Sequence, residues 1–113
     1  MFKHLNIRGE KWKKKMEKEK TLAAFNAVMP TFAIFQDEKR QQLMIELCCK
    51  GEMTVNELTE TTELSRPAVS HHLKLMLTAG VIKVRQVGVE RHYSPNLAPI
   101  VKKLKALTAA LEE

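Results

Sequence analysis

Residues 54–80 constrain the fold of this chain more than any other stretch, because they predict two short helices that meet at a tight turn. Thr54 followed three residues later by Glu57 fits a capping box, so a helix is predicted to begin directly after Thr54 and to end near residue 62. After the turn, Ser65 can cap a second helix whose first turn contains Pro67, where a missing N–H has no cost. This order of elements is typical of a helix-turn-helix.

The second of these helices, which is predicted to end at Gly80, has two chemically different faces. Its apolar side carries Val69, Leu73, Met76 and Leu77, and its polar side carries Arg66, Ser70, His71 and Lys74. We expect the apolar side to pack in the core. The polar side is then left to contact a partner.

A β-hairpin is predicted after the second helix. The segments VIKVRQ and RHYS alternate in polarity, and the four residues between them offer a turn with Gly88 at its tip. A helix-turn-helix followed by a hairpin with basic strands is a winged helix-turn-helix. A helix of this kind fits the DNA major groove, while basic groups around it contact phosphates.

Charge is distributed unevenly along the chain, whose net charge is +6. Residues 37–63 carry −4 and residues 64–94 carry +4, so a basic block directly follows an acidic one. Clustered positive charge favours binding to a polyanion, although the same pattern also fits a solvated surface. Residues 1–20, at +5, are expected to be a basic extension ahead of a domain at residues 21–113. This extension has three interpretations: a DNA-adjacent or dimer-flanking arm, a contact with an anionic membrane surface, or a solvated tail.

Two apolar helices are predicted to flank the winged helix. The first covers the stretch near residues 22–35, where Pro30 is expected to kink or restart it. The last begins at Asn96 and has the apolar spacing of a coiled-coil seam, which favours pairing with another helix. The candidate residues for such pairing are Leu22, Phe25, Met29, Phe32, Leu97, Ile100, Leu104, Leu107 and Leu111.

The string VNELTETTELSRPAVSHHLKLMLTAGVIKVRQVGVERHY resembles the ArsR-type (arsenic-repressor-like) winged-helix transcriptional regulators. The resemblance extends back through DEKRQQLMIELCCKGE and so covers roughly residues 37–94. It implies a homodimer joined through the first and last helices, with two recognition helices that read an inverted repeat of double-stranded DNA.

The sequence departs from this family where many relatives bind metal. The positions that match their cysteine ligands hold Thr54, Asn56 and Thr59, and the last helix contains no histidine. We therefore expect neither family metal site and no cofactor. The arginine that often follows the turn glycine is replaced by Val89, which weakens the prediction of a contact at the wing tip.

Cys48 and Cys49 are adjacent, and their Cα atoms, ~3.8 Å apart, are too close for an unstrained disulfide between them. Cys48 is expected on the packed face of the helix over residues 37–50, and a thiol-based redox sensor is the alternative. His71 and His72 point about 100° apart on a helix, which argues against a shared metal ion. We expect His71 to face DNA and His72 to pack against the hairpin or the domain surface.

Together these features predict a mainly α fold with a β-hairpin wing and a non-enzymatic, DNA-binding transcriptional repressor that acts as a homodimer in the cytoplasm. A winged-helix module that binds an acidic protein is the alternative from a different class. No segment has the length of apolar sequence that a membrane span requires. The predicted DNA-binding residues are Ser65, Arg66, Ala68, Ser70, His71 and Lys74 on the helix, and Arg85, Gln86 and Arg91 in the wing.

Overall fold

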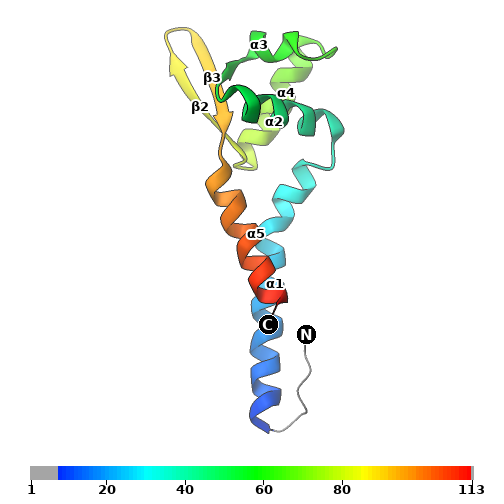
Figure 1. Cartoon of the computed structure of the whole chain (residues 1–113). Coiled ribbons are helices and arrows are strands. Elements are labelled where there is room, and N and C mark those ends of the chain that lie inside the picture. The colour runs from blue at the N-terminus through cyan, green and yellow to red at the C-terminus, as the bar shows by residue number, and fades with distance from the viewer. Residues whose placement is uncertain (1–7, 113) are drawn as a thin grey trace.

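The computed structural model describes residues 8–112. Within these residues five helices and three strands follow one another, the predicted helix-turn-helix and hairpin among them, and the two outermost helices lie away from the rest (Figure 1). The elements are α1 (Arg8–Ile34), α2 (Glu38–Lys50), β1 (Met53–Thr54), α3 (Val55–Glu60), α4 (Arg66–Thr78), β2 (Ile82–Val87), β3 (Glu90–Pro95) and α5 (Leu97–Leu111).

The helix-turn-helix consists of α3 and α4, and its predicted helix starts are confirmed. The Thr54 hydroxyl accepts the Glu57 backbone N–H at 3.2 Å, and the Glu57 carboxylate accepts the Thr54 backbone N–H at 2.9 Å. Ser65 caps α4 by accepting the Ala68 backbone N–H at 3.3 Å. Helix α3 is two residues shorter than predicted, because the backbone N–H of Thr61 already bonds the carbonyl of Leu58 in a tighter final turn.

The core lies between α2, α3, α4 and the sheet. The predicted apolar side of α4 is confirmed for Val69, Leu73 and Met76, which are fully buried, whereas Leu77 is only partly buried at the edge of the core. The core also contains Leu43, Met44, Leu47, Met53, Leu58, Val81, Ile82 and Tyr93. This packing holds α4 with its opposite side in solvent.

The sheet has three antiparallel strands in the order β1-β3-β2, so the predicted hairpin gains a third strand. Strand β1 pairs with β3 through Met53 opposite Tyr93 and Thr54 opposite His92. Its two residues are too few for an alternation pattern, which is why the sequence did not predict it. Gly88 forms the hairpin turn with a φ of +60°, a conformation that favours glycine.

Helices α1 and α5 pack against each other. Val28 and Thr31 of α1, and Leu107 and Ala110 of α5, are buried where the two helices meet. Helix α1 is much longer than α5, and its N-terminal part extends beyond the end of α5, at the far end of the chain from the wing (Figure 1).

Pro30 was expected to kink or restart the first helix, and the restart is wrong, because the 27-residue helix α1 continues through Pro30. Proline removes one N–H bond to residue 26, but Asn26 and Pro30 both face solvent, where water can satisfy the released carbonyl. Helix α1 also crosses residue 20 without a break, although the division into an extension and a domain stays a prediction. Within residues 8–112, no helix has the length and apolar character that a membrane crossing needs.

Candidate nucleic-acid interface

Helix α4 presents a continuous polar surface on the side opposite the core. Arg66, Ser70 and Lys74 recur every four residues and are all exposed, so they share one side of the helix. His71 is exposed beside them, and Ala68 is partly buried near the N-terminus. Side chains at the N-terminal end of such a helix are those that reach base edges in the major groove. The structure therefore leaves the predicted reading surface free within one chain.

Arg66 is oriented by a neighbour that the sequence prediction missed. The Arg66 Nε–H donates to the Asn56 Oδ1 atom of α3 at 2.8 Å. This bond leaves the terminal nitrogens of the guanidinium free to donate elsewhere. The only sequence signal was the polar residue at the second position of α3, and its partner ten residues away could not be identified from spacing.

A hollow of about 200 Å³ separates the start of α4 from the wing. Arg66 from α4, Arg91 from β3 and Asn56 from α3 all line it. Its remaining lining comes from Thr54, Val55, Val89 and Glu90. Two arginines facing one small hollow are a suitable arrangement for a phosphate group.

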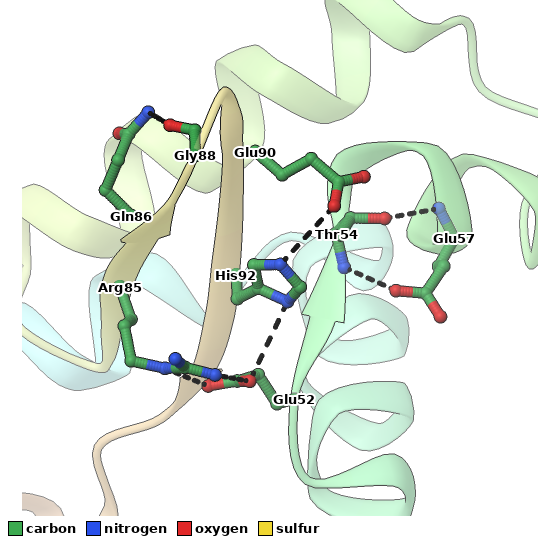
Figure 2. Close-up of polar contacts among 8 residues, drawn as sticks. All are labelled: Glu52, Thr54, Glu57, Arg85, Gln86, Gly88, Glu90 and His92. Atoms are coloured by element: carbon green, nitrogen blue, oxygen red, sulfur yellow. Dashed lines mark hydrogen bonds and ion pairs between the residues drawn. The ribbon is translucent and has the colours of Figure 1, made fainter.

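The base of the wing holds an ion pair between Arg85 and Glu52. The Arg85 Nη2 and Nε atoms lie 2.7 and 3.2 Å from the two Glu52 oxygens. Figure 2 draws both bonds. The hydrogen bond from Arg85 lowers the pKa of Glu52, and the same bond raises the pKa of Arg85. Arg85 was predicted to contact DNA, but in this structure its guanidinium is occupied by a carboxylate.

His92 lies between two carboxylates beside this pair. Its Nδ1 atom is 3.7 Å from Glu52 Oε1, and its Nε2 atom is 3.7 Å from Glu90 Oε1. Figure 2 shows His92 between these two side chains. Protonated His92 would therefore pair with both carboxylates.

The wing tip is apolar and exposed. Val89 is 97% exposed. Gln86 donates its side-chain amide to the Gly88 carbonyl at 3.1 Å, so this predicted DNA-binding side chain stabilises the turn (Figure 2). Of the three wing residues predicted to bind DNA, Arg91 is exposed and lines the hollow shared with Arg66.

Of the two places predicted for His72, the hairpin or the domain surface, the structure shows the second. Its Nδ1 atom lies 3.3 Å from Arg40 Nη1, so it contacts α2. His71 and His72 have ring centroids 6.2 Å apart. Among residues 8–112, no three His, Cys, Asp or Glu side chains are grouped to hold a metal ion.

The expectation that Cys48 is packed was wrong. Both Cys48 and Cys49 are free and exposed, whereas Leu43, Met44 and Leu47 of the same helix are buried. Cys48 follows Leu47 by about 100° around the helix, which is enough to turn it from the core into solvent.

Most predicted dimerisation residues form an exposed apolar surface on α1 and α5. Leu107 and Ile100 are the exceptions, because Leu107 is 8% exposed and packs where α1 and α5 of the same chain meet, and Ile100 is partly buried against the core. The remaining residues are 39–60% exposed: Leu22, Phe25, Met29, Phe32, Leu97, Leu104 and Leu111. An apolar surface of this kind is typical of an interface.

Comparison with known proteins agrees with the winged-helix geometry. Residues 37–84 match the model of the bacterial regulatory proteins of the arsR family. The chain is 32% identical over 65 residues to the transcriptional repressor SdpR of Bacillus subtilis (strain 168), a match that spans 58% of this chain and 71% of that protein. The chain belongs to the ArsR family.

Other ArsR relatives match the same region. The arsenical resistance operon repressor of Bacillus subtilis is 37% identical over 65 residues, which cover 58% of this chain and 62% of the relative. The chain thus spans less than two thirds of that relative's length. An ArsR-like regulator from Rhodococcus sp. RHA1 has the same fold, with a TM-score of 0.71 at 23% identity over 80% of this chain and 84% of that one.

Proposed function

We propose that this ArsR-family chain is a homodimeric transcriptional repressor that binds an inverted repeat in double-stranded DNA. The observation that carries the proposal is the exposed row of Arg66, Ser70 and Lys74 on α4, next to a hollow that Arg91 shares with Arg66. A helix with one buried and one cationic side suits the major groove, because base edges and phosphates are both within reach.

Dimerisation through α1 and α5 is part of this proposal. The exposed apolar side chains on these helices need a covering surface, and a second copy offers the same surface through a two-fold axis. Two recognition helices related by that axis would read half-sites about 34 Å apart, one turn of DNA. Because the protein must reach its operator, we place it in the cytoplasm with the DNA.

The signal that releases this repressor differs from a metal at the family's cysteine positions. Thr54 caps α3, Asn56 holds Arg66, and the Thr59 hydroxyl donates to the Val55 carbonyl at 2.7 Å, so all three matching side chains already have structural partners. Soft metals prefer thiolate ligands, and the hydroxyl and amide groups at these positions do not replace a thiolate.

Binding to DNA is tested by selecting duplexes from a random library with the full chain and measuring the affinity of the enriched sequence by fluorescence anisotropy. The expected result is an enriched inverted repeat that binds at least about 1,000-fold more tightly than random duplex. Binding to acidic proteins without any enrichment of DNA would instead favour the protein-interaction module.

The basic extension is tested by deleting residues 1–20. If its lysines contact phosphates, the deletion flattens the dependence of DNA affinity on salt. An unchanged slope would show that these residues do not contact DNA. Within one chain the N-terminal part of α1 lies far from α4 (Figure 1).

A further inference from the structure

The Glu52 carboxylate binds the Arg85 guanidinium with the geometry that a phosphate group would use. It accepts two bonds from Arg85, at 2.7 and 3.2 Å, through its two oxygens. Arginine uses the same two-bond geometry for carboxylates and for phosphates. Arg85 can therefore hold either Glu52 or a DNA phosphate with these nitrogens, but not both.

The pair is placed where DNA can displace the carboxylate. The side chains of Arg85 and Glu52 are 63% and 36% exposed. Ion pairs in contact with solvent are held weakly, whereas the phosphates of a duplex present a dense row of negative charge. An approaching phosphate is thus an effective competitor for Arg85.

His92 is a second cationic partner for the Glu52 carboxylate when its ring is protonated. Strand pairing places His92 opposite Arg85, and its Nδ1 atom is 3.7 Å from the Glu52 oxygen that Arg85 holds. The other charged groups around His92 are Glu90 on its own strand, 3.7 Å away, and Glu57 on α3, with which it interacts electrostatically. Lys50, at the end of α2, also acts on Glu57. Apart from Arg85, these charged neighbours of His92 are therefore the carboxylates of Glu52, Glu57 and Glu90.

We propose that Glu52 competes with DNA for Arg85, and that the wing engages a phosphate when this carboxylate passes from Arg85 to His92. This inference rests on the proposed function, since it concerns the same DNA interface. Glu52 is thus an internal restraint on the wing, and it limits contact with DNA of any sequence.

The test compares Glu52→Gln with the parent chain on cognate and random duplexes over a range of salt concentrations. Removing the competitor should raise affinity about twofold to fivefold per half-site on both duplexes. It should also steepen the salt dependence by about one phosphate contact per chain. Glu60→Gln is the matched control, because it removes an exposed carboxylate from α3 but leaves the partner of Arg85 in place. This control should leave the salt dependence of binding unchanged.

A double variant separates the specific effect from a general change of charge. In an Arg85→Gln background, Glu52→Gln should give no gain, because its target is absent. A gain that persists in this background, or a Glu52→Gln chain that is folded and binds no better than the parent, would overturn this inference alone. A parent chain that binds no duplex would overturn the proposed function and this inference together.

The transfer to His92 has its own readout. Protonated His92 holds Glu52 and frees Arg85, so DNA affinity should rise more on going from about pH 8 to about pH 6 in the parent than in His92→Gln. His71 is retained in both chains, so the difference between the two profiles isolates His92. Identical profiles would overturn the assigned role of His92.

Discussion

The Nη1 atom of Arg40 lies 3.3 Å from the Nδ1 atom of His72, which joins α2 to the recognition helix α4. Arginine only donates, so His72 Nδ1 accepts in this contact. The Arg40 Nε–H also donates to the Ile34 carbonyl at the end of α1, at 2.7 Å. Arg40 thus connects three helices through one side chain that is 16% exposed.

Arg40→Gln is expected to lower the free energy of unfolding by about 1–3 kcal/mol, because a carbonyl and a ring nitrogen in partly buried positions lose their donor. Urea denaturation measures the change. Lys39→Gln, a change at the exposed neighbouring position, is the control and should have little effect. A stability equal to that of the parent would show that water replaces Arg40 at both acceptors.

Arg66→Ala is expected to weaken binding to the cognate operator by about 1–3 kcal/mol and to relax sequence preference, since Arg66 is positioned to reach a base. Competition between cognate and random duplexes measures both effects. Asn56→Ala should reproduce part of the loss, because it removes the acceptor that orients Arg66. Arg85→Ala should weaken binding to all sequences similarly. Equal losses on cognate and random DNA for Arg66→Ala would contradict its role in base reading.

Thr54→Val is expected to destabilise the fold by about 1 kcal/mol, because it removes the hydroxyl that caps α3 and keeps the shape of the side chain. Thermal and urea unfolding measure the loss. Thr54→Ser retains the hydroxyl and is the control for the cap itself. A Thr54→Val chain as stable as Thr54→Ser would show that the capping bond contributes nothing.

Phe32→Glu and Leu104→Glu are expected to raise the dissociation constant of the dimer at least about tenfold, because each places a charge in the exposed apolar surface of α1 and α5. Sedimentation at several protein concentrations measures the change, and circular dichroism confirms that the chain stays folded. Val89→Glu, at the wing tip, is the control for an added surface charge. Unchanged self-association in both variants would place the dimer interface elsewhere.

Stability is expected to fall in acid, because the native state lowers the pKa values of Asp37 and Glu57. Backbone N–H bonds cause both shifts, from Arg40 to Asp37 and from Thr54 to Glu57. A carboxyl group with a lowered native pKa stabilises the fold above its unfolded pKa of about 4, and loses that contribution as pH falls through the native value.

The acid effect is checked with Asp37→Asn, which keeps a capping side chain but cannot titrate. Its free energy of unfolding should depend less on pH below about pH 5 than that of the parent, while the two curves run parallel near neutral pH. Curves that run parallel throughout the acid range would exclude a contribution from Asp37.

Local features of the fold could be predicted from the sequence, and contacts across the chain could not. The capping box of Thr54 and Glu57 is determined by residues three apart, so the sequence predicted it correctly. The exposure of Cys48 depends on which side of α2 the core leaves uncovered. The bond from Arg66 to Asn56 and the pair of Arg85 with Glu52 join residues 10 and 33 positions apart, and no pattern along the chain predicted either partner.

Strand β1 couples the wing mechanically to helix α3. Thr54 ends this strand, caps α3 and pairs with His92 of the wing. The first helix of the helix-turn-helix is therefore joined to the hairpin through a single residue, with no linker between them. A force applied to the wing is thereby transmitted to the neighbouring helix instead of being absorbed by a flexible linker. A tilt of the hairpin would therefore tilt α3 with it.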